Sequence, residues 1–500
     1  MFIRIMLLSV SLLFATHAVY ADDTDLSSVL QRLEKLEAEN KELRDKYDKL
    51  TQMLTNTTQE AETAVAAVES SKTESVNTEP ATSKSTQSNN RMIAYNPEFS
   101  FDFLDPQTRI NQKQQYILEA RRDGLLKNTG VNLQGAVTAI ANYQSADEPN
   151  LFGYLMRHPT ANNQRGTTVS EATIHSAQLG FTASLGDWVT ASAEFLFDPE
   201  QSFGAGTNTA LTRNQVQTRK AYVLFGNLDK SPLYASVGKM AIPFGLTDSV
   251  NPFTGSTVWH AFGGLANGAR FGYTKNGLNL SLMAIQGGAQ FRSANAPVEG
   301  TSVPSKLNNY AIDGNYEFAY GTDSSLLVGA SYQRGSAYCQ GFPITHFSPC
   351  EEPNGAYDVY AKWDSGNWTV KSEFAKTNDE WPGTFNPALP QFAASKVSSM
   401  DFGVQYRNEL FGKPVAYSFE FSDFQAGPDG AEWERQNQWV LGLSVRYKQN
   451  VKLFGELIKI DGYAPLNFLT GGHIPGRPDI PVSDASADSS VFMLGANASF

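Results

Sequence analysis

The chain has 500 residues, of which 18% are charged and 12% aromatic, and its 51 acidic and 39 basic side chains give a formal net charge of −12 at pH 7. A chain this acidic lacks the broad basic face of a nucleic-acid-binding protein, so we exclude that class. After the first residues no apolar run reaches the roughly 18 residues that a membrane helix needs, whereas a transmembrane β-barrel exposes only alternate residues to lipid.

Residues 1–21 predict a secretory signal peptide. Arg4 precedes a short apolar core, and Val19 and Ala21 fit the small-residue pattern of a cleavage point. For a barrel-forming chain, this export signal indicates the bacterial outer membrane.

Residues 22–54 predict a coiled coil that lies in the periplasm and joins copies of the chain. Apolar residues recur with the alternating three- and four-residue spacing of helices that wind around one another. The expected oligomerisation positions are Leu33, Leu36, Asn40, Leu43, Tyr47 and Leu50. A single solvated helix is the alternative, and the heptad does not separate a dimer from a trimer.

Two further segments separate the coiled coil from the rest. Residues 55–95 are rich in Ser, Thr, Glu and Ala, which predicts a flexible linker. Residues 96–129 form a polar, mixed pre-barrel segment. Its apolar residues Tyr116, Ile117 and Leu118 predict a short helix inside or beneath the mouth of a barrel.

From residue 130 to residue 500 the apolar pattern changes to a period of two, which predicts strands. Val189, Ala191 and Ala193, for example, alternate with Thr190 and Ser192. We expect sixteen strands, starting near residues 130, 172, 188, 216, 233, 268, 278, 308, 324, 356, 367, 398, 414, 437, 451 and 489. Short and long connections alternate between them, as in outer-membrane barrels, and lipid does not tolerate an open sheet edge. The sequence therefore predicts an all-β transmembrane barrel of about 16 antiparallel strands in contact with outer-membrane lipid.

The chemistry-bearing motifs of enzymes are missing from the sequence. It contains no G-x-S-x-G, no Walker A loop, no G-x-G-x-x-G and no H-E-x-x-H. We therefore expect no enzyme, no cofactor and no metal site, although a barrel phospholipase is a remote alternative.

The third long connection, residues 242–267, is the candidate constriction. It is rich in Pro, Gly and aromatic residues and contains Trp259, His260 and Phe262. In porins the third loop commonly folds into the barrel and narrows it; the alternative here is an outer loop that packs on its neighbours.

Charged side chains at inward-facing positions decide what passes a pore. We expect both signs in the lumen, from Glu194, Lys220, Lys239, Arg270, Asp313, Glu317, Lys371, Glu373, Arg407, Glu420 and Arg446. Lys220, Lys239, Arg270 and Arg446 are candidates to bind an anionic ligand, and mixed-sign solvation of the lumen is the alternative.

Cys339 and Cys350 lie in one expected outer loop. Exported proteins meet an oxidising environment, so we predict that these two cysteines pair and stiffen that loop.

The whole layout resembles the LbtU-type (legiobactin) siderophore porins of Legionella and related bacteria, and is distantly similar to the phosphate-selective porins O and P. The best match is the segment Val237-Gly238-Lys239-Met240-Ala241-Ile242-Pro243-Phe244-Gly245, which is like the GK-x-x-x-PFG stretch of such barrels. The resemblance implies uptake of a ferric siderophore of polycarboxylate type without coupling to TonB. A general or anion-preferring diffusion porin is one alternative, and a surface adhesin or envelope-tethering barrel is another.

Overall fold

The computed structural model describes residues 41, 93–149, 151–157, 166–197, 216–286, 306–339, 353–381, 395–464, 473–474, 477–481 and 483–500. The chain divides into two compact units, residues 1–88 and 89–500. The expected signal peptide, the coiled coil apart from residue 41, and the linker apart from residues 93–95 lie outside the described residues, as does Cys350. The structure below is that of the second unit.

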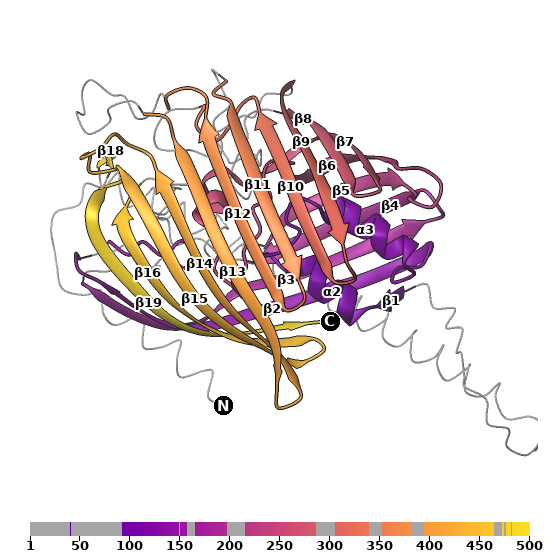
Figure 1. The fold of residues 1–500 in the computed structure, drawn as a ribbon, viewed down its shortest axis with the longest axis horizontal. Coiled ribbons are helices and arrows are strands. Elements are labelled where there is room, and N and C mark those ends of the chain that lie inside the picture. The colour runs from indigo at the N-terminus through magenta and orange to yellow at the C-terminus, as the bar shows by residue number, and fades with distance from the viewer. Residues whose placement is uncertain are drawn as a thin grey trace, which may run out of the picture. The chain divides into compact units, whose positions relative to one another are not determined.

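The second unit is a closed β-barrel (Figure 1). Each strand from β2 to β16 pairs antiparallel with the next along the chain, β16 pairs with β19, and β19 pairs with β2. Those fifteen strands together with β19 make a ring of sixteen. The barrel predicted from the sequence is confirmed, and every predicted strand start falls within five residues of the observed one. A ring leaves no unpaired sheet edge, which is what lipid requires.

The strands of the ring are β2 (Thr129–Ala146), β3 (Thr168–Leu185), β4 (Val189–Phe197), β5 (Val216–Gly226), β6 (Leu233–Ala241), β7 (Leu265–Lys275), β8 (Leu278–Gln286), β9 (Leu307–Tyr320), β10 (Ser324–Gln333), β11 (Ala356–Ser365), β12 (Trp368–Thr377), β13 (Ser398–Leu410), β14 (Lys413–Gln425), β15 (Arg435–Lys448), β16 (Val451–Tyr463) and β19 (Asp484–Ser499). Outside the ring are β1 (Ile93–Tyr95), which pairs parallel with β2, the small hairpin of β17 (His473–Ile474) and β18 (Arg477–Pro481), and the helices α2 (Pro97–Leu104), α3 (Lys113–Arg122) and α4 (Thr257–Phe262).

Alternate side chains of each strand face opposite sides of the wall. On β15, Leu441 is 54% exposed on the outside, whereas its neighbour Val440 is fully buried on the inside. Outward positions carry apolar side chains around the ring, and many inward positions carry polar ones such as Gln134 and Thr138. This is the arrangement of a barrel with lipid outside and water or protein inside.

The two ends of the barrel differ in their connections. One end, which we call the short-turn end, has connections such as Asn276-Gly277, where both residues have positive φ as a two-residue hairpin turn requires. The C-terminus lies near this end (Figure 1). Phe500 pairs through its backbone with Gly135, and a side chain at Gly135 would overlap the Phe500 ring. The aromatic C-terminus thus packs across the seam where the ring closes.

Helices are few in the described part of the chain, and none there is long and apolar enough to cross a membrane. Asn96 caps α2 by accepting from the backbone N–H groups of Glu98 and Phe99, and Pro97 occupies the first turn. The sequence pattern anticipated α3, whose Ile117 and Leu118 are buried, but neither α2 nor α4.

Candidate functional site

The connection from β6 to β7 crosses the inside of the barrel. This lumen loop, residues 242–264, contains α4 and is buried along most of its length. Its polar backbone groups find partners on the inward faces of strands on the far side of the ring, from β10 to β16. The expectation that residues 242–267 enter the barrel therefore agrees with the contacts of the loop.

Three carboxylates of the wall hold the lumen loop through its backbone. Thr247 donates its N–H to Glu373 at 2.9 and 3.0 Å, and Val250 donates to Glu420 at 3.1 Å. Phe253 and Thr254 both donate to Oε1 of Glu456, at 2.8 and 3.0 Å. Hydrogen bonds to a buried carboxylate are stronger than neutral ones. The loop backbone is thus fixed at three points along its length.

Side chains of the loop add to the same anchorage. The Ser249 hydroxyl and the Asn251 amide both donate to Glu420, at 3.0 to 3.1 Å. The Thr254 hydroxyl donates to Glu456. The loop residues between 247 and 254 therefore match the wall by side chain as well as by backbone.

These carboxylates belong to a larger set, the carboxylate row. Its members face inward from strands between β9 and β16, and each is at most 8% exposed: Asp313, Asp358, Glu373, Asp401, Glu420 and Glu456. Lys371 is the amine among them, and its Nζ lies 2.6 Å from Asp401 and 3.9 Å from Glu420. Lys371 also donates to the backbone carbonyl of Asp248 in the lumen loop.

Gly245 passes directly against the carboxylate row. Its φ of +69° lies in the left-handed region, and an added Cβ would overlap Glu373 and approach Asp358 Oδ2 to 3.1 Å. Its N–H donates to Ser331 Oγ at 2.9 Å. Glycine is required here for both backbone conformation and close approach. The Pro243-Phe244-Gly245 motif therefore has a structural role at the start of the lumen loop.

The pre-barrel segment also lies inside the barrel, toward the short-turn end. Arg121 of α3 donates to Thr190 Oγ1 at 2.8 Å and to the Gly186 carbonyl at 2.6 Å. On the other side, the guanidinium of Arg446 stacks over the Phe101 ring of α2 at 4.2 Å. Thr190 and Arg446 face inward from β4 and β15, so the segment spans the lumen between distant strands.

The pre-barrel segment and the lumen loop are joined by hydrogen bonds. Asp248 of the loop accepts from the N–H groups of Arg109 and Ile110, at 3.0 and 3.1 Å. Asn111 donates to the carbonyls of Phe244 and Gly245, at 2.8 and 2.9 Å. Burial raises the pKa of Asp248 above its usual range. We call the joined unit, residues 96–128 with 242–264, the lumen plug.

Lys113 is buried within the plug. Its ammonium donates to the carbonyls of Asp102 and Asp105, at 2.9 and 3.1 Å, next to the last turn of α2. A cation suits the C-terminal end of a helix. Burial nevertheless lowers the pKa of Lys113 to about 7, with a further contribution from the charge of Lys220.

Basic side chains outnumber acidic ones on the inner face of β4 to β7, which we call the basic wall. Arg219 and Lys220 on β5 lie 3.1 and 3.4 Å from Glu194 on β4. Arg270 on β7 donates to Ser281 and to the Asn111 carbonyl of the plug, at 2.7 and 2.8 Å. Three cations here face one carboxylate, whereas the carboxylate row has six acids and one amine. The two signs expected in the lumen are both present, with cations in excess on the basic wall and acids in excess along the carboxylate row.

The other site residues that the sequence predicts lie in different parts of the barrel, some buried and some exposed. Lys220 and Arg270 face the lumen and are buried, and Trp259, His260 and Phe262 are buried in α4. Arg446 faces inward at 37% side-chain exposure, 4.0 Å from Asp102. Glu317 and Arg407 occupy inward positions near the short-turn end and are exposed. Cys339 is buried, and its pairing with Cys350 stays a prediction because Cys350 is outside the described residues.

The structure corrects the placement of Lys239. Lys239 pairs in register with Ala221 and Asn267, and it lies two residues beyond the outward-facing Val237, which is 56% exposed. Side chains two apart in a strand share a face, so Lys239 belongs to the outer face of the wall. Its ammonium donates to the Thr218 carbonyl at 3.0 Å. Lys239 is therefore not part of the basic wall in the lumen.

Several residues that build this site are not among those expected from the sequence. Asp358, Asp401 and Glu456 are missing from the expected lumen residues. Asn111 of the plug belongs to no sequence pattern that would mark it. A charged residue in the middle of an alternating strand, on the face opposite the apolar one, is the signal that finds the first three.

No group of three or more His, Cys, Asp or Glu side chains in the described residues is arranged to hold a metal ion.

No known protein-family profile matches the chain. Over 161 residues it is 29% identical to a UPF0422 protein of Coxiella burnetii, an alignment that covers 32% of this chain and 31% of that protein. The chain thus spans about a third of the length of that relative.

Among solved structures, the anion-selective porin from Comamonas acidovorans is 13% identical, with a TM-score of 0.44 over 74% of this chain and 99% of that one. OprB of Pseudomonas putida is 10% identical, with a TM-score of 0.45 over 79% and 99%. The outer membrane channel DcaP of Acinetobacter baumannii is 15% identical, with a TM-score of 0.44 over 74% and 97%. Identities this low carry no information on what the chain transports.

Proposed function

We propose that this chain is an outer-membrane channel that takes up a small anionic solute, a ferric siderophore of polycarboxylate type, without coupling to TonB. The closed ring with an apolar exterior supports a membrane location, with the short turns in the periplasm and the long connections outside. The observation that carries the proposal of selective uptake is the lumen plug, which is built from the chain itself and bonded to the wall on two sides.

A plugged lumen favours selective uptake over general diffusion. In a wide, water-filled pore the inward polar side chains would be hydrated, but Lys371, Gln438 and Glu194 are at most 3% exposed. A solute at this level either uses a narrow path or displaces part of the plug. Either route discriminates between solutes, because channels select by the size of the path and by the groups that line it.

The charge distribution supports an anionic solute. The cations of the basic wall outnumber their carboxylate, whereas three of the six members of the carboxylate row are already used to anchor the loop. A polycarboxylate chelate would meet Lys220 and Arg270, and exchange of weak contacts along this wall would allow passage.

The independence from TonB is supported by the modest size of the plug. Its N-terminal part runs only from residue 96 to residue 128, between the expected linker and the first strand of the ring. The resemblance of residues 237–245 to siderophore porins points to the same class of solute.

Two measurements test this proposal. Purified full-length protein in planar bilayers is expected to show small conductance steps that a ferric polycarboxylate siderophore blocks. Lys220→Gln should weaken that block about fivefold, since it removes one charge from the lumen, whereas Lys448→Gln, at the exposed end of β15, should not. Large steps with no block would instead support a general or anion-preferring porin.

The second measurement is made in cells. Uptake of radiolabelled iron, supplied as its siderophore complex, is compared in wild-type and deletion strains. Equal uptake in both strains would overturn the siderophore assignment. Equal uptake together with an absence of conductance would favour the adhesin or tethering alternative.

A further inference from the structure

The outer face of strands β6 to β10 ends in polar and cationic residues at the long-connection end. Lys239 on β6 faces outward and pairs in register with Asn267 on β7. Arg334 directly follows β10, and its backbone N–H continues the ladder by donating to the Tyr310 carbonyl of β9 at 3.0 Å. We call this set the cationic rim. Its members are Lys239, Asn267, Gln286 at the end of β8, the exposed Lys306 directly before β9, and Arg334.

Aromatic side chains show where the rim lies relative to the membrane. Tyr310, opposite Arg334, is 37% exposed on the outer face, and its ring packs against Tyr332 with 6.2 Å between the centroids. Toward the short turns, the outward side chains of β9 include Ile312 and Phe318, which are 46% and 50% exposed. Tyrosines gather where the apolar band of a barrel meets the headgroups. The guanidinium of Arg334 therefore lies at the level of the outer headgroups.

The cations of the rim lack a carboxylate partner. In the part of the chain that the structure describes, none of Lys239, Lys306 and Arg334 forms an ion pair. The Lys239 ammonium donates to the Thr218 carbonyl at 3.0 Å, and Arg334 Nη1 donates to the Asn308 carbonyl at 2.8 Å. A carbonyl accepts a hydrogen bond but leaves the charge of the donor uncompensated.

The nearest wall carboxylates of these strands are already used in the lumen. Glu194 faces two cations, with Arg219 at 3.1 Å and Lys220 at 3.4 Å. Asp313 on β9 faces inward and accepts from the Ser331 hydroxyl at 2.7 Å. Neither carboxylate is on the outer face. Among the described residues, the rim therefore has a surplus of positive charge.

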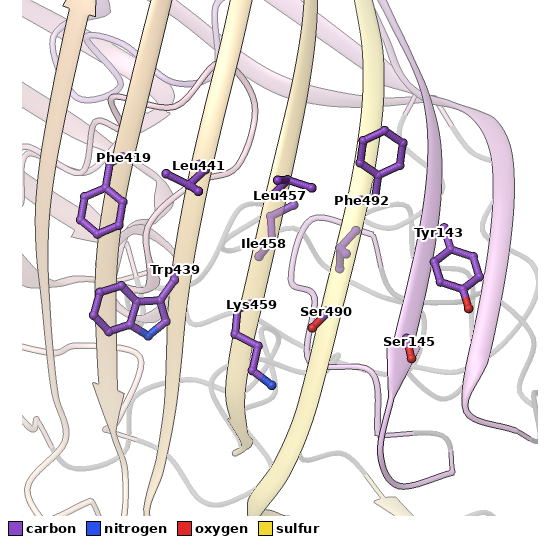
Figure 2. Close-up of a pocket in the computed structure, with 11 residues that line it drawn as sticks. Tyr143, Ser145, Phe419, Trp439, Leu441, Leu457, Ile458, Lys459, Ser490 and Phe492 are labelled. Atoms are coloured by element: carbon purple, nitrogen blue, oxygen red, sulfur yellow. The ribbon is translucent and has the colours of Figure 1, made fainter.

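The outer face of β14 to β16 and β19 differs at the same end. Lys459 Nζ lies 3.0 Å from Asp488 Oδ2 and 3.7 Å from Asp461 Oδ1, and the charge of Arg435 acts on both aspartates. Arg435 also acts on Asp423. Figure 2 shows Lys459 among the side chains around a hollow of about 420 Å³ on this face. Two cations among three acids leave no positive surplus there.

We propose that the cationic rim binds the phosphate groups of lipid A, the phosphorylated glycolipid of the outer leaflet. A cation on the outer face of a membrane barrel is unfavourable unless it reaches the interface and a counter-charge. Phosphate oxygens accept strong, charge-assisted hydrogen bonds from lysine and arginine. Lys239 and Arg334 each contact one phosphate, and the amides of Asn267 and Gln286 between them donate to sugar oxygens.

This inference rests on the membrane orientation proposed above, but not on what the lumen transports. Its test is native mass spectrometry of the full-length protein in detergent micelles titrated with lipid A, monophosphoryl lipid A or phosphatidylglycerol. Lipid A should bind about twofold to fivefold more tightly than its monophosphoryl form, because loss of one phosphate removes one exposed ion pair. Phosphatidylglycerol should bind more weakly still. Inorganic phosphate should not displace lipid A, since the free ion makes no contact with the amides of the rim.

Variants separate the rim from general lipid contact. Lys239→Gln and Arg334→Gln should each weaken lipid A binding about twofold to fivefold, and the double variant should lose the preference for the second phosphate. Arg334→Lys keeps the charge and should retain most of the affinity. Lys459→Gln is the matched control, because it removes an outward lysine at the same end that is paired with Asp488, and it should bind as the wild type does. Folding of each variant is checked by its heat-dependent mobility on gels.

Three outcomes would overturn the inference. These are equal binding of lipid A and its monophosphoryl form, displacement of lipid A by inorganic phosphate, and a loss in Lys459→Gln as large as that in Lys239→Gln. Any of them, in a chain that still conducts in bilayers, would leave the proposed function intact. Failure of the chain to enter bilayers would instead contradict the membrane location itself, and so the proposed function.

Discussion

Replacing Gly245 with alanine tests whether the lumen loop depends on its close approach to the wall. The new methyl group would overlap Glu373 and come within 3.1 Å of Asp358 Oδ2, at a backbone φ of +69°. Glu373 is buried and accepts both of its loop hydrogen bonds from the Thr247 N–H. It cannot move aside without weakening that anchor.

The expected cost has two parts. A side chain in the left-handed region costs about 1–2 kcal/mol, and leaving the buried Thr247 N–H without its partner costs about 1–3 kcal/mol. We therefore expect Gly245→Ala to lower the free energy of unfolding by about 2–5 kcal/mol if both apply. The start of the lumen loop should also become less well fixed.

Gly321→Ala is the matched control. Gly321 has a similar φ of +67°, in the turn between β9 and β10, and an added Cβ there meets no atom within 4 Å. It should cost only the backbone part. Urea unfolding in lipid vesicles gives both free energies, and bilayer recordings show whether Gly245→Ala raises the conductance or its noise. Equal costs for the two variants, with unchanged conductance, would refute the reasoning.

Three further results are expected. Glu420→Gln should give larger or noisier conductance steps. Glu420 accepts hydrogen bonds from Ser249, Val250 and Asn251 of the lumen loop, and the NH₂ group of a glutamine cannot accept them. Conductance steps like those of the wild type would count against this anchor. Burial lowers the pKa of Lys113 to about 7 from 10.5. Between pH 7 and pH 10.5, Lys113 therefore binds fewer protons in the docked plug than in the undocked state. Docking of the plug should strengthen as the pH rises above 7. Hydrogen exchange of α3 at about pH 6 and about pH 9, corrected for intrinsic rates, should show this change, and Lys113→Met should abolish it. Mass spectrometry without reductant should find Cys339 and Cys350 in one linked peptide, and alkylation of both thiols in the native protein would disprove the pairing.

Strand positions were predictable because one face of each strand contacts lipid and the other faces the lumen. The first requires apolar side chains, and the second accepts polar ones. In the segment from Met400 to Tyr406, the apolar side chains at 400 and 402 face outward while Asp401 faces inward. Lipid and lumen impose this alternation on every crossing, so it repeats along the chain. The predicted starts of β3, β7 and β19 were less accurate. These strands begin earlier than predicted, at the long-connection end, where the alternation between lipid and lumen no longer applies.

The lumen plug was less predictable, since its contacts join residues that are far apart in the chain. Val250 and Glu420 are 170 positions apart, and no local pattern connects an aspartate or glutamate on the wall to a backbone N–H of a distant loop. Lys239 shows a second limit. Its charge suggested the lumen, but the register of β6 assigns it to the outer face, where its long side chain reaches a carbonyl.

The position of the plug constrains the order in which the chain assembles. The pre-barrel segment precedes β2, yet the cylinder seals only when the final strand, β19, pairs with β2. Glu456, the last of the three loop anchors along the chain, lies on β16, which pairs with β19. The lumen plug must therefore be largely assembled before the cylinder shuts, or else the pre-barrel segment enters afterwards through the short-turn end and the lumen loop through the long-connection end. The machinery that inserts this chain into the membrane must therefore close the barrel around the lumen plug.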